Sequence, residues 1–139
     1  MEKNFIILCD SAEVEPSTKK LNIKGVFDTI FVDGVPAVYA KEFSVITNFE
    51  VNPGAHTGSY RIIDDTKGTV VVDHPIFNFS VSELSNRHQF IHRLINLNLN
   101  SIGKYTVKIF IDNQEVGSTY FIVKQVAASP SYYSQISNA

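Results

Sequence analysis

Short segments in which apolar and polar residues alternate make up most of this 139-residue chain. Gly, Pro, Asn and Asp interrupt them at the close intervals typical of β-sandwiches. The clearest segment is residues 95–100, where Ile95, Leu97 and Leu99 alternate with asparagines. All its apolar side chains fall on one face, so a shift of one residue would invert the strand. Residues 5–9 are apolar on both faces instead, which indicates a strand covered on both sides.

Similar patterns predict strands along the rest of the chain, at residues 20–33, 43–51, 60–63, 70–72, 77–81, 105–111 and 120–123. Gly25 lies inside the first of these, which indicates a bulge or a close backbone approach. The last two segments flank Asp112-Asn113-Gln114 and read as a hairpin. We therefore predict an all-β fold, an antiparallel two-sheet sandwich of seven or eight strands, immunoglobulin-like or with a Greek-key element.

Residues 87–94 are ambiguous, because Phe90, Ile91 and Leu94 follow helical spacing. One short helix near residues 87–94 is thus the alternative to a further strand. No other window is both long and helix-periodic.

One domain is expected at this length, and 44% hydrophobic residues with only 19% charged residues are enough for a core. We assign residues 1–126 to the β-sandwich domain and residues 127–139, where the alternation stops, to a flexible C-terminal tail. The predicted core residues are Ile7, Leu21, Ile23, Phe27, Val45, Phe49, Phe79, Leu97, Leu99, Tyr105, Val107, Ile109 and Phe121.

Charge and cysteine content narrow the classes of function. The net charge of −2 lacks the basic excess of nucleic-acid-binding proteins, so we expect no nucleic-acid partner. The apolar run at residues 5–9 is too short for a signal peptide or a membrane helix, so we expect no membrane partner. A single cysteine, Cys9, excludes an intrachain disulfide framework, and the cytoplasm is the simplest location.

His88 and His92 have the H-x-x-x-H spacing with which two imidazoles bind one metal ion from a helix. On a strand the same four-residue step spans roughly 13 Å, which is too far for one ion. We interpret them as solvated polar strand residues. Cys9 follows four apolar residues and precedes Asp10, whose charge raises a thiol pKa, so it is predicted to be a core residue.

The carboxylates offer two hypotheses, both based on loops that meet at one end of a sandwich. Asp33, Asp64 and Asp65 are the candidates for a calcium site, although no D-x-D-x-D-G loop is present. Asp64, Asp65 and His56 are the candidates for an enzymatic carboxylate/histidine site. Nucleophile-elbow, phosphate-loop and dinucleotide motifs are absent. We assign no catalytic, cofactor-binding or metal residue and expect no cofactor.

The C-terminal segment contains paired aromatics, Tyr132 and Tyr133. Paired aromatics make good anchors on a partner surface, so they are the predicted partner contact. A frayed terminus is the alternative.

Two further sets of residues resemble those of known protein families. The residues of the first are Phe5–Asp10, Lys20–Ile30, Val35-Pro36-Ala37, Leu97–Asn100, Gly103-Lys104-Tyr105 and Asp112-Asn113. In these the chain resembles a family of uncharacterised small prokaryotic proteins, a domain of unknown function, as far as about Val123. Two loops depart from that pattern, the short link from Asn100 to Gly103 and Asn113 in place of glycine. The resemblance implies a β-sandwich and transfers no functional residue.

Gly103-x-Tyr105 also resembles the tyrosine corner of immunoglobulin-like sandwiches, which implies that the Tyr105 hydroxyl bonds back to the preceding turn. Val107 occupies the position where those domains have a cysteine.

We predict a non-enzymatic binding or scaffold module that acts through protein–protein contacts. Its partner is another protein or a second copy, bound at an open sheet edge. The alternatives are the enzyme described above and a calcium- or carbohydrate-binding module.

Overall fold

A computed structural model of the chain describes residues 4–126, and all regular structure in that range is β-strand. The strands are β1 (Phe5–Val14), β2 (Leu21–Val26), β3 (Thr29–Val32), β4 (Ala37–Tyr39), β5 (Phe43–Glu50), β6 (Gly54–Asp64), β7 (Thr69–Asp73), β8 (Phe77–Val81), β9 (Arg87–Leu94), β10 (Leu97–Leu99), β11 (Gly103–Ile111) and β12 (Gln114–Gln125). The all-β prediction is confirmed. The predicted number of strands is too low, because residues 20–33 divide into β2 and β3 and because β4 was not foreseen. Within the described range no helix is long and apolar enough to cross a membrane.

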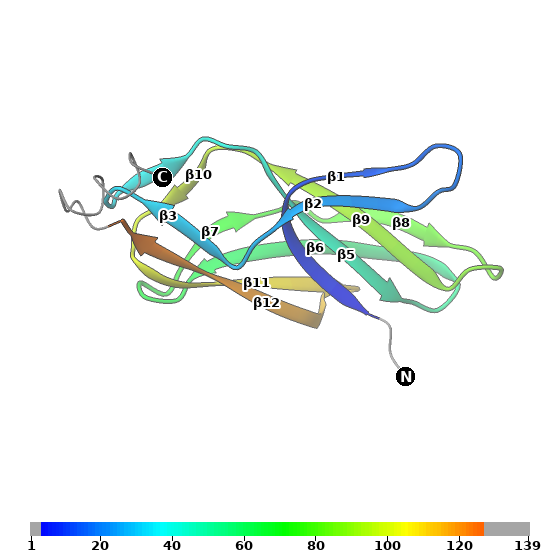
Figure 1. The fold of residues 1–139 in the computed structure, drawn as a ribbon. Coiled ribbons are helices and arrows are strands. Elements are labelled where there is room, and N and C mark those ends of the chain that lie inside the picture. The colour runs from blue at the N-terminus through cyan, green and yellow to red at the C-terminus, as the bar shows by residue number, and fades with distance from the viewer. Residues whose placement is uncertain (1–3, 127–139) are drawn as a thin grey trace.

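Two main sheets form the layers of the sandwich (Figure 1). Sheet A has the order β2-β1-β5-β9, and sheet B has the order β3-β12-β11-β6-β7, with β8 also paired to β6. A small pair, β10-β4, stands apart from both. Neighbouring strands are antiparallel except β3 and β12, which are parallel. The fully antiparallel prediction is therefore wrong at this edge, where the chain crosses from sheet A and lays β3 along β12.

The main core fills the space between the sheets with side chains from alternate positions. In β11, Tyr105 and Val107 are completely buried, and the Tyr105 ring stacks on Phe121 of β12 with centroids 5.2 Å apart. The predicted core residues that are buried are Val45, Phe49, Leu97, Leu99, Tyr105, Val107, Ile109 and Phe121. The others are half-buried: Ile7, Leu21, Ile23, Phe27 and Phe79.

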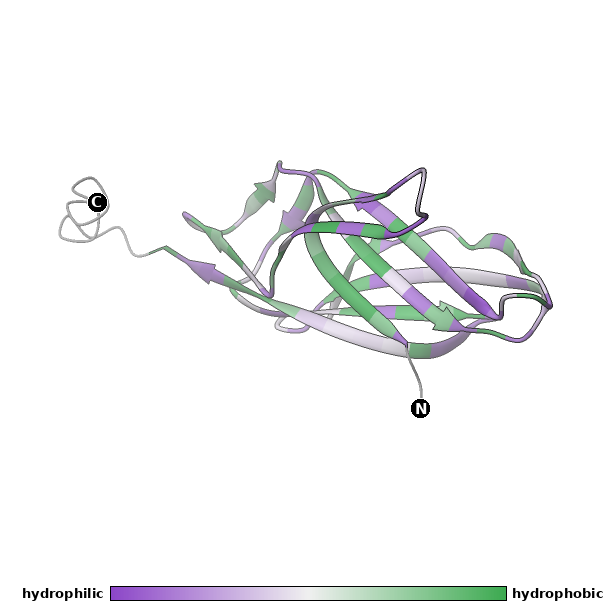
Figure 2. Ribbon diagram, turned by 45° about the vertical axis from the view of Figure 1, so that its right-hand side comes forward, coloured by the Kyte–Doolittle hydropathy of each residue, from purple (hydrophilic) through white to green (hydrophobic). Residues whose placement is uncertain are grey.

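A second, smaller core lies on the outer face of sheet A. The middle of β1 bends sharply, so that its second half and β2 form a hairpin that leaves the plane of the sheet (Figure 1). An Arg93 amine of β9 donates to the Ala12 carbonyl of this hairpin over 3.3 Å. Cys9, Ala12 and Ile46 are buried beneath it. The first half of β1 is apolar throughout (Figure 2), because its two faces serve the two cores.

Gly25 allows the bend in this hairpin. Its φ of +67° is a backbone conformation that L side chains rarely adopt, and a Cβ at this position would collide with the carboxylate of Asp10. The close contact at Gly25 is therefore with the Asp10 side chain, and β1 and β2 pair without a bulge there.

Residues 87–94 form strand β9, so the helical alternative is wrong. All eight residues pair with β5. The apparent helical spacing arises because Phe90 faces inward while Ile91 packs into the second core on the outer face. Apolar residues on both faces hide the period of two.

The predicted tyrosine-corner hydrogen bond is present. The Tyr105 hydroxyl donates to the Ser101 carbonyl over 2.9 Å and accepts from the Ser101 amide over 3.1 Å. Both backbone groups of Ser101 are thereby satisfied inside the core, which fixes the link between β10 and β11.

The predicted hairpin between β11 and β12 is also confirmed. Its two turn residues, Asp112 and Asn113, have φ of +53° and +63°, as a two-residue primed turn requires. Asn tolerates this conformation, which explains why glycine is not needed at Asn113. The turn lies beside β6, because the Asp112 carboxylate accepts from the Thr57 amide over 2.9 Å.

Candidate functional site

All four histidines of the chain lie along one side of the sandwich, where β8 of sheet B approaches β9 of sheet A. With the neighbouring rings they form the histidine–aromatic cluster: His56, His74, His88, His92, Tyr60, Phe77, Phe79 and Phe90. The alternation of β9 places His88, Phe90 and His92 on its inner face. There they meet the rings of β8, so this cluster closes the gap between the two sheet edges.

The rings pack closely, and all are half-buried except Tyr60, which is buried. Phe79 stacks on His88 with centroids 4.0 Å apart, and the Phe77 and Phe90 rings meet edge to face at 4.5 Å. A Cβ at Gly58 would lie 2.6 Å from the Phe77 ring, so glycine makes room for this ring. The interpretation of His88 and His92 as solvated residues is wrong, because an inward-facing position on an edge strand is covered by the opposite sheet.

His56 carries a positive charge. Its Nδ1 lies 2.7 Å from an Asp112 carboxylate oxygen and its Nε2 lies 2.6 Å from the Asn52 carbonyl oxygen. Both partners only accept, so both ring nitrogens must donate, as they do in an imidazolium. The hydrogen bond to Asp112, with that to Asn52, raises the pKa of His56. His56 in turn lowers the pKa of the Asp112 carboxyl.

His88 and His92 are neutral at pH 7. Burial, followed by the electrostatic effects of the neighbouring His74 and His88, lowers the pKa of His92 to about 4. Burial also lowers the pKa of His88, and the charge on His56 contributes. Nε2 of His88 is buried and has no hydrogen-bond partner within residues 4–126. The cluster therefore runs from a cation at one end to uncharged rings at the other.

This cluster does not form a metal centre. Among the described residues no three His, Cys, Asp or Glu side chains are placed to hold an ion. The His74 Nδ1 donates to the Pro75 carbonyl oxygen over 2.7 Å, which fixes the position of this ring nitrogen.

The predicted enzymatic site is not assembled. His56 and Asp64 lie near opposite ends of β6, and eight residues of strand separate them by roughly 26 Å. Asp64 is completely buried, where one carboxylate oxygen accepts from the amides of Thr66 and Lys67. Asp65 accepts from the Thr106 hydroxyl at 2.6 Å. Both carboxylates thus hold the β6–β7 turn. Asp33 does not join them in a three-carboxylate calcium site.

Cys9 is a core residue, as predicted. It is completely buried, and burial, followed by the charge of Asp10, raises the pKa of its thiol. The protonated thiol packs with Ala12 and Ile46 in the second core.

A different feature has the form of a binding site. Residues 31–41 line an open groove of about 800 Å³ between β3 and β4, called here the β3–β4 groove. Ile30 and Val32 of β3 belong to the main core, and Ala37 and Tyr39 of β4 pack against that core. Three large apolar side chains around it are exposed: Phe31 by 63%, Val35 by 37% and Val38 by 57%.

The strands that border this groove each have one partner. β3 pairs with β12 and β4 pairs with β10, so each has its other edge free in the described structure. Sequence patterns missed the groove because β4 is only three residues long and because a strand's free edge depends on the global topology. Tyr132 and Tyr133, the predicted partner contact, lie outside the described residues.

Comparison with known proteins places the sequence in a family and matches the fold. A family model described as a family of unknown function (DUF6941) matches residues 4–124. No curated protein matches the sequence.

Two solved structures illustrate the structural similarity. A β-glucosidase from Listeria innocua in complex with isofagomine has 8% identity and a TM-score of 0.50, over 91% of this chain and 17% of its own. The alkylpurine DNA glycosylase AlkC of Pseudomonas fluorescens, bound to DNA containing an abasic site analog, has 13% identity and a TM-score of 0.48, over 70% of this chain and 27% of its own. The chain spans only about a sixth to a quarter of these proteins. At this identity the glucosidase match concerns the fold alone.

Proposed function

We propose that this chain, which belongs to the family of unknown function DUF6941, is a non-enzymatic binding module. It binds an extended segment of a partner protein in the β3–β4 groove. Strand addition of this kind supplies affinity through main-chain hydrogen bonds and specificity through alternate side chains. The observation that carries the proposal is that two strands with free edges border one groove.

The apolar surface around the groove supports this proposal. Phe31 and Val38 keep more than half of their surface exposed, although they belong to strands next to a well-packed core. Large apolar residues grouped on an edge are the feature by which interaction sites differ from the ordinary protein surface. A bound segment would cover them.

Both strands are short, which is one protection against unwanted pairing, but they lack the other features that protect sheet edges. Charged residues, proline and bulges usually block an exposed edge. The edge strand of sheet A follows this rule, because β2 carries Lys24 and the kink at Gly25. β3 and β4 read Thr-Ile-Phe-Val and Ala-Val-Tyr, with no charge and no proline. They are suited to accept another strand.

Peptide selection tests this function. The immobilised protein is used to select from a random peptide display library, and a selected peptide is then titrated by calorimetry. The expected peptides are extended and apolar at alternate positions. Val38→Lys, which places a charge on the β4 edge, is expected to weaken binding at least about tenfold, equivalent to about 1.4 kcal/mol.

Val26→Asp is the matched control, because Val26 is equally apolar and is 68% exposed on the β2 edge. Binding by this variant should be unchanged. Peptides that bind Val38→Lys as well as they bind the original chain would exclude the groove as the site.

The proposal also covers the C-terminal segment, the type of sandwich and the location of the protein. Tyr132 and Tyr133 are a second contact, and deletion of residues 127–139 is then expected to weaken partner binding without changing the melting temperature. The tail boundary at residue 127, an immunoglobulin-like arrangement, a cytoplasmic location and the absence of nucleic-acid partners are also proposed.

A further inference from the structure

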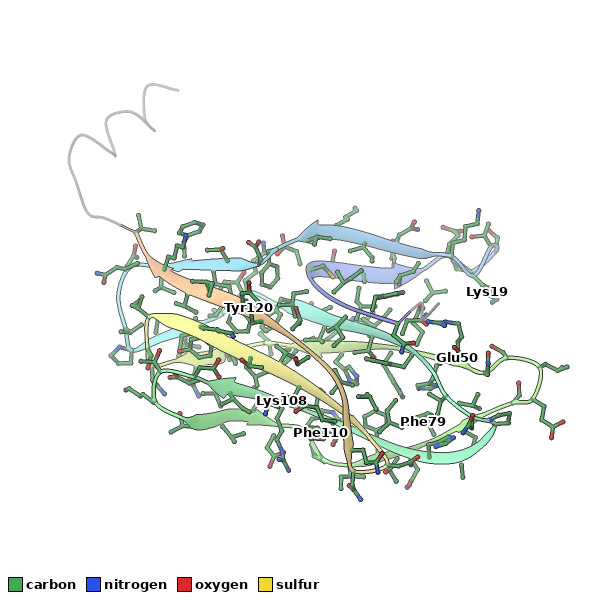
Figure 3. All side chains as sticks on the ribbon, turned by 90° about the horizontal axis from the view of Figure 1, so that it is seen from below. Lys19, Glu50, Phe79, Lys108, Phe110 and Tyr120 are labelled. Atoms are coloured by element: carbon green, nitrogen blue, oxygen red, sulfur yellow. The ribbon has the colours of Figure 1, made fainter. Side chains whose placement is uncertain are left out.

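A second cavity lies beside the histidine–aromatic cluster, on the outer face of sheet B. Its volume is about 360 Å³, within the range of small-molecule sites. Ser59 and Arg61 of β6 line it, with Asp73 and His74 at the end of β7, and with Phe110. Figure 3 looks onto this outer face, where Phe110 and Lys108 of β11 are labelled.

Arg61 makes two contacts at the cavity. Its guanidinium lies over the Phe110 ring, with Cζ 5.1 Å from the ring centroid, and its Nε donates to an Asp73 carboxylate oxygen over 3.1 Å. Within residues 4–126 Asp73 alone accepts from this guanidinium. The two terminal amines are therefore able to bind a carboxylate in a bidentate manner.

The Asp73 carboxylate supplies an acceptor at the same cavity. One of its oxygens accepts from Arg61, and the other is able to accept from a ligand. His74 also lines the cavity, but its ring stacks on Tyr60 of the histidine–aromatic cluster with centroids 4.8 Å apart. The Asp73 carboxylate suits an ammonium group, which has three donors and a positive charge.

We propose that this cavity binds a free α-amino acid with an apolar side chain. The ligand carboxylate pairs with Arg61, its ammonium group with Asp73, and its side chain covers Ile76, which is 62% exposed at the cavity. A plain anion would face the Asp73 charge and a plain amine would face Arg61, whereas a zwitterion satisfies both. The Arg61–Asp73 pair is solvent-exposed, so its geometry is adjusted at little cost.

The test is an amide chemical-shift titration with L-leucine and, separately, L-phenylalanine. Saturable shifts are expected at residues 59, 61, 73, 74 and 113. 4-Methylpentanoate lacks only the ammonium group of leucine, and 3-methylbutylamine lacks only its carboxylate. Each is expected to bind at least about tenfold more weakly, because half of the charge pairing is lost.

Substitutions at the two charged cavity residues test whether they bind the amino acid. Arg61→Gln and Asp73→Asn are each expected to weaken leucine binding at least about tenfold. Lys108→Gln is the control, because Lys108 is an ion-paired cation on the same face outside the cavity. Absence of saturable shifts with both amino acids, shifts confined to other residues, or equal binding of 4-methylpentanoate would overturn the proposal. Each result is independent of the β3–β4 groove.

Discussion

At the scale of single residues, His92 is the most strongly perturbed of the four histidines. Its pKa of about 4 lies below the ordinary 6.5, because burial among rings penalises the imidazolium. A lowered pKa means that the unfolded chain binds the proton first. Stability is therefore unaffected above pH 6.5, falls between pH 6.5 and about 4, and is constant below that range.

His92→Phe tests this linkage. His92 contributes a loss of roughly 3 kcal/mol between pH 7 and pH 4, and this contribution is expected to disappear when an uncharged ring replaces the imidazole. Urea unfolding at both pH values measures the difference between the two proteins. An equal loss in both would show that His92 does not determine the acid sensitivity.

His56 contributes with the opposite sign. Its raised pKa gives stability that is complete below pH 6.5 and is lost as the pH rises through the folded value. The lowered pKa of Asp112 gives stability that is complete above pH 3.8 and is lost in stronger acid. The His56–Asp112 pair thus adds most to the free energy of unfolding between pH 3.8 and pH 6.5. Because the original chain and His92→Phe both contain this pair, the difference between the two proteins isolates the effect of His92.

Tyr105 allows a second prediction. Tyr105→Phe removes the hydrogen bonds to both backbone groups of Ser101 inside the core, and should lower the free energy of unfolding by about 1 kcal/mol. Tyr120→Phe is the control, since Tyr120 is 53% exposed, and it should change stability by less than about 0.5 kcal/mol. Equal effects of the two changes in chemical denaturation would argue against the tyrosine corner.

At the scale of elements, the attachment of β8 depends on a contact with Gly58. Gly58→Ala places a methyl group against the Phe77 ring, so β8 must shift or the ring must leave the cluster. We expect a loss of about 1–3 kcal/mol, as for other overpacked sites. Thermal unfolding measures it. Gly34→Ala is the control, because its nearest neighbour, the Gln125 amide, lies 3.9 Å away. A Gly58→Ala protein as stable as this control would contradict the tight packing.

The sequence predicts a strand well where only one face of that strand is buried, because apolar and polar residues then alternate. Leu97 and Leu99 are buried while Asn98 is exposed, and the two-residue turn at Asp112 gives the hairpin its register. The sequence of β9 does not show a period of two, because Ile91 on the outer face belongs to a second core. Nothing near Ile91 in the sequence signals that the β1–β2 hairpin covers it.

At the scale of the whole molecule, the sites could not be predicted because they depend on the packing of distant strands. His56 and His88 are separated by 32 positions in the sequence but belong to one ring cluster. The parallel pairing of β3 with β12 likewise follows from where the chain crosses between sheets. Composition and spacing are local, whereas these contacts arise from topology.

The topology leaves β3 and β4 with free edges around one groove. The proposed function is that a partner segment adds as a strand to these edges. Hydrogen exchange of the amides, measured with and without a peptide selected on the protein, tests it most directly. Addition of a strand should slow exchange at residues 29–32 and 37–39, with little change in β2. Protection that appears instead on β2, or that is absent from both β3 and β4, would contradict the proposal.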